Sequence, residues 1–277
     1  LFILMLVRTI YFFTRPDAIL ASVIPDDAFY YIVIAIHRVN DGLWSFDGHA
    51  PATGFHLLYA YILSALLSIF KGINWKFLYL VIATLASLSI SYSYYILAKL
   101  CKELFGNLAP YWVALPFLSP IVVMQSTSLM ESWLVILFAA LTITEATKDS
   151  QLNWPKAFIL FIIGIGGSFS RSDYGMLPGM IFLCFLLQGG NSPSALAYRR
   201  SGCILFGAAT GAILGLTHNR YISNHFFQAS AQIKLYWSEM NGHDVMAPIG
   251  LMKDIFFPFN GKIPLYTFGI LFVLYLM

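Results

Sequence analysis

Two adjacent carboxylates, Asp26 and Asp27, are the first residues in the chain whose spacing suggests chemistry. They follow Pro25 and precede an apolar run. Carboxylates in this position favour the start of a helix, because they face unpaired amides and the positive end of the helix dipole. Two neighbouring acids exceed what a cap requires. One could act as a general base while the other orients a hydroxyl or holds a cation; the alternative is that Asp26 only caps the helix.

Two basic side chains could bind an anionic or hydroxylated ligand. A segment containing glycine and proline, residues 45–56, delivers His56 to the start of an apolar stretch. There His56 could donate to a phosphate or a sugar hydroxyl, or it could simply rest among lipid headgroups. Lys234 stands in a later polar segment, where it could contact a phosphate or be a solvated surface lysine.

Three further ionisable residues interrupt apolar sequence. Glu131 begins a long apolar run, and Arg171 and Asp173 separate two others. Ionisable groups at membrane depth are costly and usually mark a pathway or a site. The structural alternatives are a dipole partner for Glu131 and a simple ion pair for Arg171 and Asp173.

The composition indicates which elements must position these side chains. Of the 277 residues, 59% are hydrophobic and 10% are charged, and the mean hydropathy is +0.75. Soluble domains carry about 25% charged and about 45–50% apolar residues. So little charge excludes a soluble enzyme, a nucleic-acid binder and a disordered scaffold, and a net charge of +3 is too small to indicate a polyanionic partner. The expected fold class is an all-α polytopic membrane protein.

The apolar stretches predict a single transmembrane domain over residues 1–277, which we expect to be a piece of a longer chain. A spanning helix needs about 20 residues, or fewer where the bilayer is thinned. The polar segments 15–54, with a helix at the membrane interface, and 218–263 are predicted to be extracytoplasmic loops. The candidate spans are 1–14, 55–70, 77–98, 108–124, 130–147, 157–169, 174–187, 202–217 and 264–277.

Lysine and arginine in short loops predict which side each loop faces. Three basic loops are consistent with a cytoplasmic position: Lys99 with Lys102, Lys148 with Lys156, and Arg199 with Arg200. The turns that carry Glu131 and Arg171 then face outward. The count of crossings requires that either 55–70 is re-entrant or 108–124, which contains three prolines, does not cross. The first choice keeps all the unusual carboxylates on one side.

The order of these motifs resembles the GT-C superfamily of polytopic glycosyltransferases, in particular the bacterial and archaeal mannosyl- or arabinosyltransferase-like membrane proteins. The resemblance covers roughly residues 20 to 240. It rests on Asp26-Asp27-Ala28-Phe29-Tyr30-Tyr31, Phe46-Asp47-Gly48, Pro51-Ala52-Thr53-Gly54-Phe55-His56, Met130-Glu131, Ser170-Arg171-Ser172-Asp173, Asn219-Arg220-Tyr221 and Ser230-Ala231-Gln232-Ile233-Lys234. Three positions depart from the pattern: Leu57 and Ser172 stand where proline is common, and Leu129 where glycine is common.

The resemblance implies an inverting transfer of sugar from a polyprenyl-phosphate-linked sugar donor to an acceptor hydroxyl on a glycan, lipid or protein. The reaction would occur on the extracytoplasmic side of the lipid bilayer, in a prokaryotic plasma membrane. Asp26 and Asp27 take the place of the acidic pair, either of them as base. His56, Arg171 and Lys234 would contact phosphate or sugar. No cofactor is required, although the acidic pair could hold a divalent cation.

Two other functions fit some of these features. A transporter of lipid-linked sugar or of a small solute also carries ionisable residues among apolar helices. Transporters tend to place such groups near the midplane and in two related halves, whereas here they lie at span ends. A non-catalytic subunit of a membrane complex is the other alternative, and it predicts no effect on transfer when Asp26, Asp27 and Lys234 are lost together.

Overall fold

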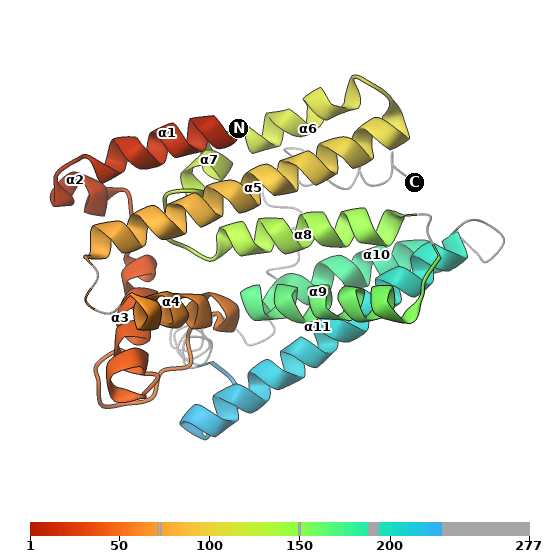
Figure 1. Ribbon diagram of the computed structural model, residues 1–277. Coiled ribbons are helices and arrows are strands. Elements are labelled where there is room, and N and C mark those ends of the chain that lie inside the picture. The colour runs from red at the N-terminus through yellow and green to blue at the C-terminus, as the bar shows by residue number, and fades with distance from the viewer. Residues whose placement is uncertain (71, 73, 149–150, 188–193, 229–277) are drawn as a thin grey trace, which may run out of the picture. The chain divides into compact units, whose positions relative to one another are not determined.

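The computed structural model describes residues 1–70, 72, 74–148, 151–187 and 194–228. The chain divides into two units, Leu1–Phe226 and Phe227–Met277. The helices of the described residues lie in the first unit and are shown in Figure 1: α1 Phe2–Phe13, α2 Asp17–Ser22, α3 Asp26–Asp41, α4 Leu57–Ile69, α5 Trp75–Phe105, α6 Ala109–Phe117, α7 Pro120–Gln125, α8 Ser132–Thr147, α9 Trp154–Ser170, the short 3₁₀ helix η1 Ser172–Gly175, α10 Met176–Leu187 and α11 Ser194–Ser223.

The prediction of a helical protein is confirmed for the described residues, which contain no strand beyond an isolated bridge between Ser45 and Pro51. Among the residues that the structure describes, two helices are long and apolar enough to cross a membrane: α5, and residues Leu196–Ser223 of α11. In the most apolar 18-residue stretch of each helix, only 39% (α5) and 28% (α11) of the residues are buried within the protein. Five other apolar helices are shorter.

Most predicted spans correspond to a single helix, but 108–124 does not. It forms α6 and α7, two helices of nine and six residues. The prolines explain the break: Pro116 lies inside α6, and Ser119 caps α7 immediately before Pro120. The span predicted at 264–277 lies outside the described residues.

The predicted outer segments contain helices of their own. Residues 15–54 include α2 and α3, and α3 begins at Asp26 after Pro25, as the sequence predicts. At the other end, α11 continues to Ser223, so the predicted loop boundary at 218 falls inside a helix.

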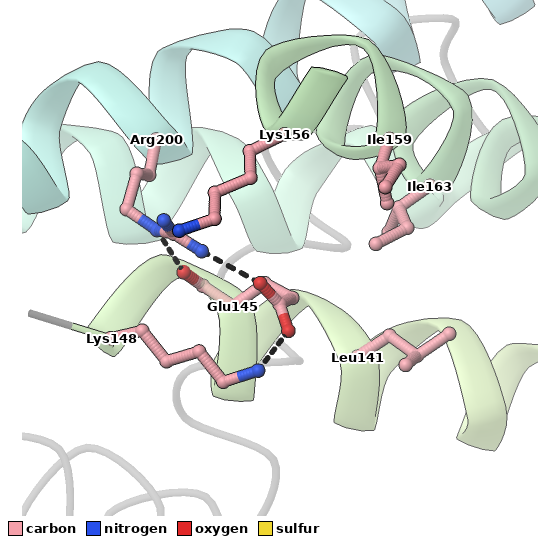
Figure 2. A pocket seen from close by; sticks show the side chains of 7 residues that line it. All are labelled: Leu141, Glu145, Lys148, Lys156, Ile159, Ile163 and Arg200. Carbon is pink, nitrogen blue, oxygen red and sulfur yellow. Dashed lines mark hydrogen bonds and ion pairs between the residues drawn. The ribbon is translucent and has the colours of Figure 1, made fainter. Parts of the chain in front are cut away.

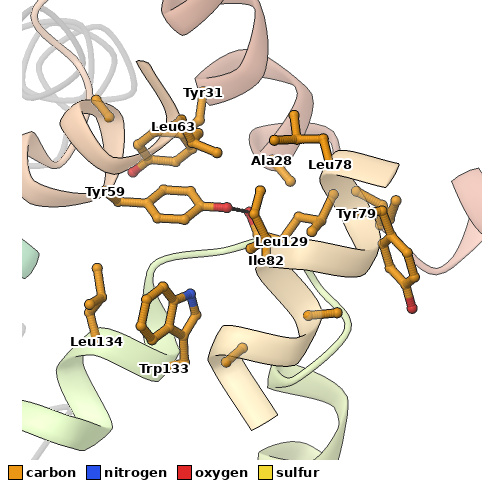
Figure 3. Packing of buried hydrophobic residues seen from close by; sticks show 14 of the residues in the cluster. Ala28, Tyr31, Tyr59, Leu63, Leu78, Tyr79, Ile82, Leu129, Trp133 and Leu134 are labelled. Carbon is orange, nitrogen blue, oxygen red and sulfur yellow. Dashed lines mark hydrogen bonds between the residues drawn. The ribbon is translucent and has the colours of Figure 1, made fainter. Parts of the chain in front are cut away.

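A large apolar core joins α1, α3, α4, α5 and α8. Figure 3 shows its centre, where Tyr59 of α4 and Trp133 of α8 pack beside residues of α5. A smaller cluster joins α8, α9 and α11 through Ala146, Leu160, Ile163 and Ile204. Residues of α4 and of the first turn of α8 thus belong to the same, larger core.

Helices α9 and α11 pack with almost no space between their backbones. A Cβ added to Gly164 would lie 2.1 Å from the Ile204 carbonyl oxygen, and one added to Gly207 would lie 2.1 Å from that of Phe161. The hydroxyl of Ser168 donates to the Ala208 carbonyl at 2.7 Å. Small residues four apart, such as Gly164 and Ser168, are typical of close contacts between membrane helices.

Candidate functional site

The loop between α3 and α4 has an ordered turn and ends at His56, directly before α4. Gly42 ends α3 in the left-handed region, at φ 72°. Asp47 then accepts hydrogen bonds at 2.8 Å from the backbone amides of His49 and Ala50, and one at 3.0 Å from the Ser45 hydroxyl. These bonds lower the pKa of Asp47 to about 2. Asp47 therefore organises the turn.

Glu131 is presented by a tight turn between α7 and α8. Leu129 has a positive φ of 54°, which explains why this position suits glycine, and its side chain is buried. The Tyr59 hydroxyl donates to the Leu129 carbonyl at 2.5 Å (Figure 3). Glu131 occupies the N-cap position of α8, but its side chain makes no capping bond. The carboxylate is directed elsewhere.

Glu131 and three other residues that the sequence singles out form one cluster. Its Oε1 lies 3.4 Å from Nε2 of His56 and 3.9 Å from a terminal nitrogen of Arg171. The Arg171 Nε also donates to Asp173, at 2.9 and 3.2 Å. The Arg171–Asp173 ion pair, which the sequence suggests as the structural alternative, is present, and it is joined to Glu131 and His56.

Burial differs sharply across this cluster. The Glu131 side chain is 4% exposed, whereas those of Arg171 and Asp173 are 46% and 55% exposed. The other carboxylate oxygen of Glu131, Oε2, is buried and has no hydrogen-bond partner among the described residues. Leaving a buried acceptor unsatisfied is costly. The Oε2 atom therefore has an unused capacity to accept hydrogen bonds within the described part of the chain.

Tyr31 of α3 forms the aromatic wall of the cluster. Its ring stacks on that of His56, with centroids 6.3 Å apart and planes 23° from parallel. Burial raises the pKa of Tyr31, and the Glu131 carboxylate adds to the shift, so the phenol stays protonated and can donate. Burial lowers the pKa of His56; Glu131 opposes this shift and Arg171 adds to it. The imidazole is therefore neutral near pH 7.

The acidic pair lies at the edge of the cluster rather than inside it. Asp26 and Asp27 are both exposed, in the first turn of α3. The Asp27 carboxylate contributes to the raised pKa of Tyr31, as Glu131 does, and Arg171 opposes it. Tyr31 therefore feels charges from the acidic pair and from the cluster together. Lys234, the remaining predicted contact, lies outside the described residues.

No metal centre is preformed in the part of the chain that the structure describes. It contains no group of three or more histidine, cysteine, aspartate or glutamate side chains able to hold an ion. Any cation bound by Asp26 and Asp27 would need further ligands from substrate or water.

Sequence reasoning did not single out two tyrosines. Tyr31 belongs to the acidic motif, yet only the fold shows that it stacks on His56. Tyr59 lies one helical turn after His56, and its hydroxyl holds the turn 70 residues away. Helical spacing places Tyr31 four residues after Asp27, on the same face. That signal was available for Tyr31, whereas no local signal marks Tyr59.

Comparison with known proteins gives no relative: no protein-family model, no curated protein and no solved structure matches the chain.

Proposed function

We propose that this chain is a multi-pass membrane glycosyltransferase that moves a sugar from a polyprenyl-phosphate donor to an acceptor hydroxyl on the extracytoplasmic side. The observation that carries the proposal is the meeting of His56, Glu131 and Arg171 around one buried carboxylate oxygen. The three residues come from well-separated segments. The sequence suggests a phosphate or sugar contact for His56, the resemblance implies one for Arg171, and Glu131 is singled out as an ionisable group at the edge of an apolar run.

The surface of the helices supports a bilayer environment. Large apolar side chains are widely exposed, for example Tyr111 and Trp112 at 72% each and Phe206 at 68%. Exposed apolar patches of such extent are rare on soluble monomers. The small-residue contact between α9 and α11 is a second indication, since membrane helices associate through close packing rather than through burial from water.

The placement of charge along α8 and α9 supports several crossings. Glu131 precedes α8 and Lys148 follows it, while Lys156 lies at the start of α9 and Arg171 follows its end. The two helices are 16 and 17 residues long, or about 24 and 26 Å. Polar residues therefore gather at both ends of an apolar layer close to the thickness of a thin bilayer.

The transfer needs three groups, and the cluster contains a candidate for each. Arg171 is partly exposed and could pair with the donor phosphate, stabilising the charge that develops as it leaves. The Oε2 of Glu131 could accept a bond from a sugar hydroxyl. The acid pair supplies the base: a bond forms from the acceptor oxygen to the anomeric carbon, the carbon–phosphate oxygen bond breaks, and the hydroxyl proton passes to Asp26 or Asp27.

A divalent cation fits this chemistry only as an ion shared with the donor. Two exposed neighbouring carboxylates suit Mg²⁺, which is commonly bound by one or two carboxylates together with substrate phosphate. Asp26 and Asp27 would hold it, and its charge would help to neutralise the leaving phosphate.

The proposal is tested by following transfer of radiolabelled sugar from polyprenyl-phosphate-mannose and polyprenyl-phosphate-arabinose by the purified protein. D26N and D27N are compared with wild type, with D41N as the matched control, an exposed carboxylate at the far end of the same helix. We expect one of the pair to lose about 10²–10⁴-fold in rate, the usual contribution of a positioned base, while D41N transfers normally. Wild-type rates in both D26N and D27N would end the assignment.

A further inference from the structure

A second polar cluster occupies the opposite ends of α8 and α9 from the candidate site. It surrounds a cavity of about 380 Å³ lined by Leu141, Glu145, Lys148, Lys156, Ile159, Ile163 and Arg200 (Figure 2). The lining carries three cations and one carboxylate, together with three aliphatic side chains.

The single carboxylate is already fully engaged. One oxygen of Glu145 pairs with Lys148, and the other accepts from Arg200 at 2.6 Å. Arg200 also donates to the Glu145 carbonyl at 2.6 Å, and it is 1% exposed. Glu145 therefore fixes the geometry of the buried guanidinium, and each of its oxygens already pairs with a cation.

Lys156 completes the positive lining without an ion pair among the described residues. Its one hydrogen bond there goes to the Gln151 carbonyl, at 3.3 Å. An ammonium has three donors, and Figure 2 shows it on the side of the cavity where Arg200 and Glu145 meet. Among the described residues, the lining therefore has an excess of positive charge and unused donors on Lys156, which suits an anion.

The rest of the lining indicates which kind of anion. Leu141, Ile159 and Ile163 line the same cavity as the cations, so a bound molecule meets a charged end and an apolar end. Trp154, two residues before Lys156, is 89% exposed, as is typical of aromatic side chains at a membrane–water interface. Basic pockets between membrane helices on the cytoplasmic side are suited to anionic headgroups.

We propose that this cavity binds the phosphodiester headgroup of an anionic phospholipid on the cytoplasmic side, with the start of an acyl chain against the three aliphatic residues. The inference depends on the membrane placement under the proposed function, but not on sugar transfer. It gives Lys148 and Lys156 a ligand-binding role and Arg200 a structural one.

Native mass spectrometry of the purified protein, titrated with phosphatidylglycerol or with phosphatidylcholine of the same chains, tests the site. We expect tighter binding of phosphatidylglycerol, weakened about fivefold by K148Q and by K156Q, and about 25-fold by both together. K102Q is the matched control, an exposed lysine near the end of α5 on the same predicted side. Unchanged retention in gel filtration shows that the variants remain folded.

Three results would overturn the site: equal affinity for the two lipids, equal loss in K102Q, or no loss in the double variant. Inorganic phosphate is titrated separately, and competition by millimolar phosphate that displaces phosphatidylglycerol completely would assign the cavity to a soluble anion instead. The lipid titration contains no sugar donor, so it does not depend on transfer activity. A failure to bind phosphatidylglycerol would therefore not argue against sugar transfer, and a failure of transfer would not argue against this lipid site.

Discussion

Glu131 combines a high desolvation cost with a proposed role in substrate binding. A carboxylate that is 4% exposed loses hydration, and its contacts at 3.4 Å to His56 and 3.9 Å to Arg171 restore only part of it. Its second oxygen has no partner among the described residues. Under the proposed function, this oxygen accepts a hydrogen bond from the substrate.

Changing Glu131 should therefore separate activity from stability. We expect E131Q to reduce transfer about 10- to 100-fold, because a hydrogen bond to a charged group contributes about 1.5–3 kcal/mol. The thermal unfolding midpoint should shift by no more than a few degrees, because removing a buried charge also removes its desolvation cost. E103Q, an exposed glutamate on α5, serves as the control. Normal transfer by E131Q would exclude Glu131 from the site.

His56 predicts a pH dependence of stability. Burial lowers its pKa in the folded protein, so below the ordinary imidazole value of about 6.5 the unfolded chain binds a proton that the folded chain does not. The stability that this group contributes is present above that pH and is lost as the pH falls. Thermal unfolding at pH 7.5 and 5.5 should show a smaller drop for H56Q than for wild type. H49Q, which changes an exposed histidine of the neighbouring loop, should behave like wild type, and an H56Q drop equal to that of wild type would refute the prediction.

At the scale of elements, the contact between α9 and α11 positions Arg171, which directly follows α9. The sequence shows the glycines but not their partners, because Gly164 and Ile204 are 40 residues apart and only the fold brings them together. Apolar period and proline position predict most helices. Pro116 and Pro120 also mark the break between α6 and α7 in the sequence. The positive φ of Leu129 depends on local packing and is not evident from periodicity.

The packing of these two helices is testable with one methyl group. G207A places a Cβ about 2.1 Å from the Phe161 carbonyl oxygen, so the helices must separate, at a cost of about 1–3 kcal/mol. G215A lies on the same helix, and its Cβ would meet only the Leu57 side chain, at 3.7 Å. Thermal unfolding in detergent should show a lower midpoint for G207A and little change for G215A. Equal midpoints would mean that the close contact does not form.

The candidate site likewise contains residues that the sequence predicts and one that only the fold shows. Residue type and position at span ends nominated His56, Glu131, Arg171 and Asp173, and the structure brings these four together. Tyr59 could not be predicted, because its role depends on a turn distant in sequence.

At the scale of the whole first unit, charge gathers at the two ends of α8 and α9 and leaves an apolar layer between them. One end carries Glu131 and Arg171, and the other carries Glu145, Lys156 and Arg200. Under the proposed function, a bilayer would occupy this layer, and this placement would account for both the exposed apolar side chains and the two separate polar clusters.

Single cysteines test this arrangement. Asp173→Cys and Lys156→Cys, each in a chain whose Cys101, Cys184 and Cys203 are changed to alanine, are labelled in sealed vesicles with a membrane-impermeant maleimide. Both positions are exposed, and almost the full length of α9 separates them. We expect the cysteine at position 173 to be labelled only from the extracytoplasmic side, and the cysteine at position 156 only from the cytoplasmic side. Labelling of both from the same side would rule out a crossing by α9.

The central claim, that the cluster around Glu131 holds the phosphate of a lipid-linked sugar, is tested most directly by a cryo-electron microscopy structure with polyprenyl phosphate bound. We predict phosphate density within about 4 Å of the Arg171 guanidinium, the distance of an ion pair, with the isoprenoid chain along neighbouring apolar helix surfaces. Phosphate density found only away from Arg171, with the surroundings of the Glu131 Oε2 atom unchanged, would contradict it.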